Sequence, residues 1–300
     1  MTRYPFSTQI LNAIERNYWI ISRKIVGLTN YKIYHDDPLH EFPAQPFPKF
    51  IRSAKTKLKQ QHGTWFLDMK VRDETRRTYA FLEKPFDPAK PTIIFHHGAG
   101  MINYRNILWL YFFRGVLTKY NLISIKAQAH ESTMTFAKNG FNTLTHQTAT
   151  FAGSVLMVEA LVRWLKTQRS MPIVVGASMG GIVATWHWLL FDTAACYFPI
   201  TAYPNVTEIF LGDGYNGATD HRRDRQRLSA YTKAFVAQAK NPKSSKGNVF
   251  PVLGKNDTIV PYPSAQKFWK GYDVLTFPNG HMTTALHYNK ITAYIASKLP

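Results

Sequence analysis

Cysteine is almost absent from this chain of 300 residues, because Cys196 is the single example. No internal disulfide can therefore form, and we expect a reducing, cytoplasmic setting. Cys196 stands in the apolar run 194–198, which predicts a buried thiol that packs as a small hydrophobe. No apolar run approaches the length of a membrane span, and the first residues lack the apolar core of a secretion signal, so we expect neither feature.

Acidic residues are also few. Asp and Glu number 18 against 37 Lys and Arg, which gives a formal net charge of +19 at pH 7. Such a charge attracts polyanions such as nucleic acid, anionic lipid or acidic polymer. No nucleic-acid-binding motif accompanies it, and Lys and Arg are spread along the chain, so we expect no nucleic-acid partner. A generally basic proteome would explain the charge equally well.

Motifs that bind metals and cofactors are missing as well. The sequence has no zinc-ligand spacing, no phosphate-binding glycine loop and no dinucleotide fingerprint. We therefore expect neither a metal nor a cofactor.

What the chain does have is an alternation of strand-like and helix-like segments. Its hydrophobic content of 45% suffices for one large core, and α/β chains of this length commonly form a single domain. The alternation is typical of an α/β fold with a mostly parallel sheet and helices on both faces. The expected strands are an opening antiparallel pair, 62–71 and 75–83, followed by 91–95, 122–127, 172–175, 194–201, 247–254 and 273–277. The expected helices are 105–119, 147–167 and 181–190.

The most informative stretch is residues 172–181, where a β-branched run ends in the pattern G-x-S-x-G and continues into an apolar helical segment. This pattern between a strand and a helix is typical of a nucleophile elbow, here with Ser178 at its tip. The serine of such a turn takes a strained backbone conformation that projects its hydroxyl clear of the sheet. Gly176 and Gly180 stand where strand and helix nearly touch and where only glycine fits. The alternative is an ordinary tight turn with a solvated serine.

Three further motifs stand at the ends of expected strands. A His-His-Gly-Ala-Gly segment, residues 96–100, follows the strand 91–95, and the last two strands are followed by Asp257 and His281. A serine hydroxyl is a poor nucleophile unless a base lies within hydrogen-bond reach. Histidine can take and return a proton near neutral pH, and a buried carboxylate can fix its tautomer.

A serine, then an acid after one strand, then a histidine after the next is the triad order of the α/β-hydrolase superfamily, which this sequence resembles. The resemblance implies that Ser178 is the nucleophile, that His281 is its general base and that Asp257 orients the histidine. It also implies an oxyanion hole formed by the backbone N–H groups of Met179 and Ala99, the latter in an H-G-x-G turn.

Other residues could fill two of these roles if Asp257 only closes a turn or His281 only lies at the surface. The alternatives are Glu208 and Asp213 for the acid and His287 for the base. Of the two remaining histidines beside the oxyanion turn, we expect His97 to orient the turn, whereas His96 has no clear role.

The resemblance covers about residues 61–300, which we expect to form the catalytic domain after a helical extension of residues 1–60. The alternation of strands and helices stops at about 203–246, where we expect a short helical lid. That segment carries a basic run, 221–227, which is either a solvated helical face or a contact surface for an anionic substrate or membrane.

The extension has its own pattern. Apolar residues between positions 10 and 26 recur at helical spacing among Lys, Arg and Glu. Such a helix either packs on its own protein or lies in a membrane interface, so an anionic membrane surface stays open as a partner. Residues 42–50 are rich in proline and aromatic side chains and predict an extended connector.

These patterns together predict a serine hydrolase that cleaves a small-molecule ester or acyl substrate through an acyl-enzyme. Amide cleavage and acyl transfer use the same residues and stay open, as does a lipid-surface acylhydrolase. A non-catalytic binding protein on this fold is a further alternative, although the intact set of three residues argues against it. The natural substrate does not follow from the motifs, because specificity resides in the lid and pocket walls.

Overall fold

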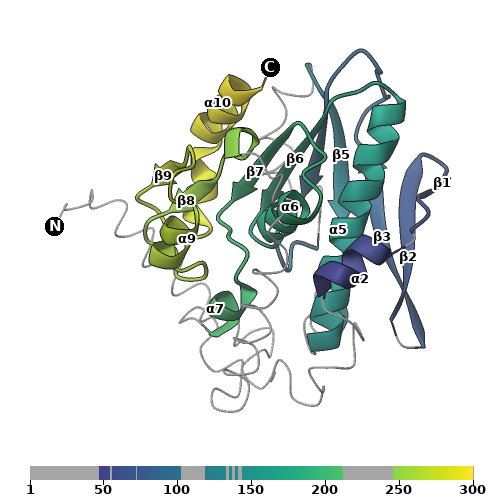
Figure 1. The fold of residues 1–300 in the computed structure, drawn as a ribbon, viewed down its shortest axis with the longest axis horizontal. Coiled ribbons are helices and arrows are strands. Elements are labelled where there is room, and N and C mark those ends of the chain that lie inside the picture. The colour runs from purple at the N-terminus through teal and green to yellow at the C-terminus, as the bar shows by residue number, and fades with distance from the viewer. Residues whose placement is uncertain are drawn as a thin grey trace.

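The computed structural model describes residues 47–54, 56–71, 73–102, 119–132, 135–136, 139–140, 144–211 and 246–299, and it has one central sheet with helices against both faces (Figure 1). The strands are β1 (Lys59–Gln61), β2 (Thr64–Val71), β3 (Glu74–Leu82), β4 (Thr92–His96), β5 (Asn121–Lys126), β6 (Pro172–Ala177), β7 (Cys196–Ile200), β8 (Val252–Gly254) and β9 (Leu275–Phe277). The α-helices are α2 (Phe47–Ser53), α5 (Leu144–Thr167), α6 (Met179–Leu190), α7 (Val206–Leu211), α9 (Tyr262–Phe268) and α10 (Tyr288–Lys298), and the 3₁₀ helices are η4 (Lys246–Asn248) and η5 (Thr283–His287).

The strand order of the sheet is β1-β2-β3-β5-β4-β6-β7-β8-β9. The first four strands in this order pair antiparallel, and from β5 onward every pairing is parallel. The expected opening pair is confirmed, because β2 and β3 form an antiparallel hairpin with Val71 opposite Glu74. The carboxyl ends of the parallel strands therefore meet along one edge, which is where ligands bind in sheets of this kind.

The core lies on both sides of the parallel strands. β4 and β6 are buried along their whole length, as expected for parallel strands that are covered on both faces. Ile94 belongs to the apolar cluster that contains side chains of α5 and α6, whereas its neighbours Ile93 and Phe95 belong to the cluster that contains α10. Cys196 is a free, buried cysteine in the second cluster, as the sequence predicts.

Helix α5 corrects the expectation that no apolar run approaches the length of a membrane span. Within the described residues, its segment Thr145–Thr167 is long and apolar enough to cross a membrane. However, 83% of the most apolar window is buried inside the protein, where α5 contacts β2, β3 and α6. A helix that is apolar on most sides is also what the core of a large domain requires, and α5 serves that purpose here.

Helix α2 corrects a second expectation, because residues 47–53 are helical whereas 42–50 predicts an extended connector. Proline at the second position of the helix is compatible with this. The N–H groups of the first turn have no acceptor within the helix, so a residue without an N–H loses no hydrogen bond there. Phe47 and Ile51, one turn apart, are both buried, and the Phe47 ring meets the Trp186 ring of α6 edge-on at 5.3 Å. This tertiary packing outweighs the local composition.

The strand expected over 247–254 is a third correction. Residues 246–248 form η4, Val249 makes an isolated bridge to Tyr197, and β8 begins only at Val252. Pro251 has no N–H to donate to a ladder, which explains why regular pairing starts after it. The last strand is also shorter than expected, since β9 covers Leu275–Phe277.

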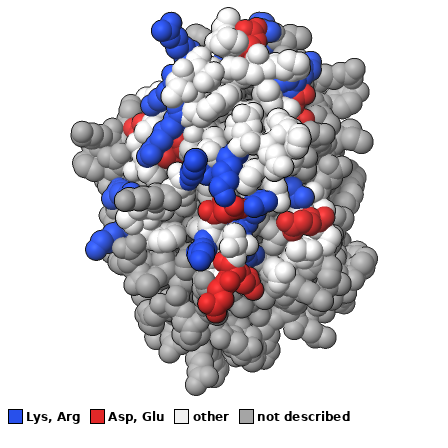
Figure 2. Space-filling model, turned by 90° about the vertical axis from the view of Figure 1, so that its right-hand side faces the viewer, with Lys and Arg blue, Asp and Glu red and all other residues white. Residues whose placement is uncertain are grey.

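Several expectations lie outside the described residues. These are the N-terminal amphipathic helix, nearly all of the helix 105–119, most of the lid segment 203–246, and the basic run 221–227. Figure 2 views the side of the molecule on which β1–β3 lie, and there Lys and Arg stand among Asp and Glu. Among the described residues of these strands, Asp68 of β2 pairs with Lys59 of β1 and with Arg77 of β3, so positive charge there has acidic partners.

Candidate active site

Ser178 occupies the turn between β6 and α6, where its φ is 55° and its ψ is −115°. A positive φ is uncommon for a residue with a side chain and marks local strain. The turn is held in place because the Ser178 N–H donates to the Ile200 carbonyl at 2.9 Å. The side chain is half-buried, unlike its buried neighbours Ala177 and Met179, so the hydroxyl remains reachable.

The glycines of the motif are required by backbone contacts. A Cβ on Gly176 would overlap the carbonyl of Gly180, and a Cβ on Gly180 would overlap the carbonyl of His96 at the end of β4. A Cβ on Gly181 would overlap the side chain of Ala202. The first of these contacts is the close approach of strand and helix that the motif predicts, and the second ties the elbow to the neighbouring strand.

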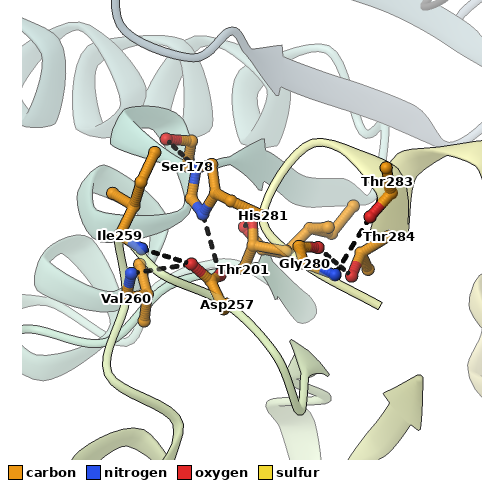
Figure 3. Close-up of polar contacts among 10 residues, drawn as sticks. Ser178, Thr201, Asp257, Ile259, Val260, Gly280, His281, Thr283 and Thr284 are labelled. Carbon is orange, nitrogen blue, oxygen red and sulfur yellow. Dashed lines mark hydrogen bonds and ion pairs between the residues drawn. The ribbon is translucent and has the colours of Figure 1, made fainter. Parts of the chain in front are cut away.

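The structure brings together the three residues that the sequence singles out, and Figure 3 draws them with their hydrogen bonds. The Nε2 atom of His281 lies 2.8 Å from the Ser178 hydroxyl oxygen. The Nδ1 atom of the same ring lies 2.8 Å from Oδ2 of Asp257. The carboxylate, the imidazole and the hydroxyl therefore form one continuous chain of hydrogen bonds.

Asp257 is held on both of its carboxylate oxygens. While Oδ2 faces the histidine, Oδ1 accepts the backbone N–H groups of Ile259 and Val260, each at 2.8 Å. The side chains of Asp257 and His281 are only 2% and 3% exposed. An ionised Asp257 accepts the proton of Nδ1, which leaves Nε2 of a neutral ring free to accept the hydroxyl proton of Ser178.

The loops that carry Asp257 and His281 are joined to each other. The Lys255 N–H donates to the Phe277 carbonyl at 2.8 Å, and the Asn256 side-chain amide donates to the Pro278 carbonyl at 2.7 Å. Within the second loop, the Gly280 N–H donates to the Thr283 hydroxyl at 3.0 Å (Figure 3). The separation of acid and histidine is thus fixed by backbone as well as by their own hydrogen bond.

The alternative residues lie elsewhere. Glu208 is exposed on α7 and accepts the Tyr203 hydroxyl at 2.6 Å. His287 bonds the Asn279 side chain at 2.7 Å and stacks on the Phe277 ring. Asp213 lies outside the described residues.

The expected oxyanion turn lies beside the serine. A Cβ built on Gly98 would be 3.4 Å from the Cβ of Ser178, so the turn and the nucleophile are in contact. Met179 is the first residue of α6, where a backbone N–H has no acceptor within the helix. Across the described residues, no hydrogen bond engages the N–H of Met179 or that of Ala99.

The histidines next to this turn are buried. His96 directs Nδ1 to the His97 carbonyl at 2.9 Å, and its Nε2 has no partner among the residues that the structure describes. His97 directs Nδ1 to the Gly98 carbonyl at 2.7 Å, as expected of a residue that orients the turn. His130 also contacts the turn, and sequence reasoning missed it. The available signal was a histidine three residues beyond an expected strand end, on the edge where the other motifs meet.

We searched the part of the chain that the structure describes for side chains that could bind a metal ion. No group of three or more His, Cys, Asp or Glu side chains there is arranged to hold a metal ion.

Known structures with a similar fold include two acetyl xylan esterases. One, from a Thermoanaerobacterium species, aligns with a TM-score of 0.53 at 17% identity over 87% of this chain and 98% of its own. The other, from a Paenibacillus species, aligns with a TM-score of 0.53 at 12% identity over 93% of this chain and 99% of its own. Est1E from Butyrivibrio proteoclasticus, solved with ferulic acid bound, aligns with a TM-score of 0.52 at 15% identity over 77% of this chain and 98% of its own.

Comparisons of the sequence itself found no match. No model of a protein family matches the chain, and no curated protein matches it. At identities this low the structural likeness carries the fold alone. Together with the strand order and the parallel core, it identifies the fold of this chain as the α/β-hydrolase fold.

Proposed function

We propose that this protein is a serine hydrolase that cleaves carboxylic esters of small molecules. The observation that carries the proposal is the chain of hydrogen bonds from Asp257 through His281 to Ser178, with both links at 2.8 Å. The strained backbone of Ser178 and its position at the start of a helix support the same reading. The fold likeness to esterases agrees with it.

The proposed reaction proceeds in two halves. Nε2 of His281 takes the hydroxyl proton as Ser178 Oγ attacks the carbonyl carbon of the ester. Asp257 stabilises the imidazolium, and the N–H groups of Met179 and Ala99 stabilise the oxyanion. The imidazolium then gives its proton to the leaving alcohol, and the C–O bond of the ester breaks to leave an acyl group on Ser178.

The second half releases the acid. Water enters as the alcohol leaves, His281 removes one of its protons, and the hydroxide attacks the acyl carbon through a second tetrahedral intermediate. When that intermediate collapses, the proton returns to Ser178 Oγ and the carboxylic acid departs.

The test is covalent labelling with a fluorophosphonate probe. The wild-type chain should be labelled and Ser178→Ala should not, because the probe requires an activated serine. Ser297→Ala is the matched control, since Ser297 is exposed on α10 and its hydroxyl donates to the Tyr294 carbonyl in the same helix. This variant should label like the wild type. Equal labelling of wild type and Ser178→Ala would refute the proposal. A series of p-nitrophenyl esters of increasing acyl length, compared with a p-nitroanilide, then separates ester from amide cleavage.

A further inference from the structure

Besides His96 and His281, two further buried histidines lie beside the oxyanion turn. His97 follows β4 and His130 follows β5, and both side chains are fully buried, with ring centroids 4.6 Å apart. Because β4 and β5 are parallel neighbours, the two side chains approach the same turn from adjacent strands. The proposed reaction assigns neither of them a proton to move.

Backbone donors fix the tautomer of both rings. Nε2 of His97 accepts the N–H of Ala127 at 3.1 Å, and Nε2 of His130 accepts the N–H of Gly100 at 3.3 Å. A ring nitrogen that accepts a hydrogen bond carries no proton, so the proton of each neutral ring lies on Nδ1. Each ring is therefore a donor at Nδ1 and an acceptor at Nε2.

His97 fixes the peptide plane before Ala99. Its Nδ1–H donates to the Gly98 carbonyl at 2.7 Å, and the same carbonyl accepts the N–H of Met101 at 3.3 Å. The Gly98 carbonyl and the Ala99 N–H belong to one planar trans peptide and point in opposite directions. Holding the carbonyl therefore sets the direction of the Ala99 N–H.

His130 fixes the peptide plane after Ala99. This plane contains the Gly100 N–H, which donates to Nε2 of His130, and the ring itself is anchored by its Nδ1–H on the Gln128 carbonyl at 2.8 Å. Gly100 has a φ of +71°, which is the left-handed conformation that the third residue of a type II turn requires. Both planes that flank Ala99 are thus held by imidazole rings.

The environment keeps both rings neutral. Burial lowers the pKa of His97 to about 4, and burial lowers the pKa of His130 well below its ordinary value. A protonated His130 would turn an Nε2–H toward the N–H of Gly100 and lose the bond to the turn. Both rings therefore keep their hydrogen bonds to the turn near neutral pH.

We propose that His130 is a positioning residue of the oxyanion hole, which acts with His97 to hold both peptide planes of Ala99 and so to direct its N–H toward the developing oxyanion. The inference rests on the proposed function, because an oxyanion forms only if Ser178 attacks a carbonyl. It assigns a role to a residue that follows β5, a strand whose end carries no member of the triad.

Two substitutions at this position separate the two hydrogen bonds of the ring. The amide of Gln reaches the position of Nε2, so His130→Gln keeps an acceptor for the Gly100 N–H. The amide of Asn reaches only the position of Nδ1, so His130→Asn keeps the donor to Gln128 and loses the bond to the turn. The pair is matched because both variants place a neutral amide in the same buried site.

The measurements are kcat/KM for a p-nitrophenyl ester and Ki for a trifluoromethyl ketone, whose adduct with Ser178 carries an oxyanion. Removal of an oxyanion donor outright costs about 10²–10³-fold in kcat, so misdirecting one should cost about 10- to 100-fold. We expect His130→Asn to lose that factor in kcat/KM and an equal factor in Ki, with His130→Gln close to wild type. Wild-type values of kcat/KM and Ki in His130→Asn would overturn the inference. Equal losses of kcat/KM in His130→Asn and His130→Gln, with Ki unchanged in both, would also overturn it.

A measurement on the unmodified protein covers the case in which His130→Asn does not fold. ¹⁵N-labelled imidazoles should give signals for several buried rings with the proton on Nδ1, those of His97 and His130 among them, and the signal that is missing from the His130→Gln spectrum is that of His130. A proton on Nε2 of His130 would overturn the inference whatever the activity. Absence of fluorophosphonate labelling in the wild type would instead refute the proposed function, so the two failures are distinct.

Discussion

Replacing Asp257 with Asn tests the site most directly, because the structure dictates how the new amide must lie. Oδ1 of Asp257 accepts two backbone N–H groups, from Ile259 and Val260. An Asn side chain must keep its oxygen there, since its NH₂ group would otherwise face two donors. The NH₂ group is then turned toward Nδ1 of His281, which can accept it only by moving the ring proton to Nε2.

The consequence is a ring that presents a donor to Ser178 and can no longer take its proton. In the analogous serine-protease triad this substitution lowers kcat by about 10⁴-fold, or about 5 kcal/mol in activation free energy. We expect Asp257→Asn to fold normally, because the substitution preserves shape and both backbone bonds, and to lose a similar factor in kcat/KM for a p-nitrophenyl ester. Asp273→Asn is the control, since the Asp273 side chain is half exposed and pairs with Lys298, while the Tyr294 hydroxyl donates to the backbone carbonyl of Asp273, which the substitution keeps. Activity of Asp257→Asn within tenfold of wild type would refute this account of the tautomer.

Two further predictions concern stability. Gly180→Ala should prevent folding or lower the free energy of unfolding by about 1–3 kcal/mol in thermal or urea denaturation, because its Cβ would overlap the His96 carbonyl. Gly63→Ala is the control, because its Cβ meets open space and adds only the strain of a positive φ. Equal losses of unfolding free energy in the two variants would contradict the contact at Gly180. Burial raises the pKa of Glu159, but hydrogen bonds from His187, Thr193 and Arg163 outweigh burial and lower that pKa from 4.5 to about 2. The ionised Glu159 therefore stabilises the fold above pH 4.5, and this stabilisation is lost as the pH falls toward 2. Between pH 7 and pH 3 the wild type should lose about 2 kcal/mol more of its unfolding free energy than Glu159→Gln in urea titrations, and parallel pH profiles would refute this linkage.

The sequence predicts the site well where chemistry depends on residues close to strand ends. Each strand that carries a motif is parallel to its neighbours, so a motif that follows one strand must lie near a motif that follows the next. This is why Ser178, Asp257 and His281 could be named without coordinates. The glycines of the elbow could be named for the same reason, because the turn is local.

The features that escaped prediction depend on contacts between distant segments. The role of His130 requires the knowledge that β5 lies beside β4, an order that no local pattern encodes. The two N–H groups that bond Asp257 point toward it because of the conformation of the turn after β8, and the residue types of that turn do not determine this conformation. Helix α2 forms where Phe47 and Ile51 pack into the core, and the composition of residues 42–50 gave no sign of it.

The contact between Gly180 and the end of β4 has a mechanical consequence. Here backbone touches backbone, at the carbonyl of His96, with no flexible side chain between them that could adjust. The nucleophile, the start of its helix and the strand that leads into the oxyanion turn must therefore shift as one rigid unit. Substrates of different shape have to be accommodated by the surrounding segments, and selection for a new substrate should alter those segments while leaving this junction unchanged.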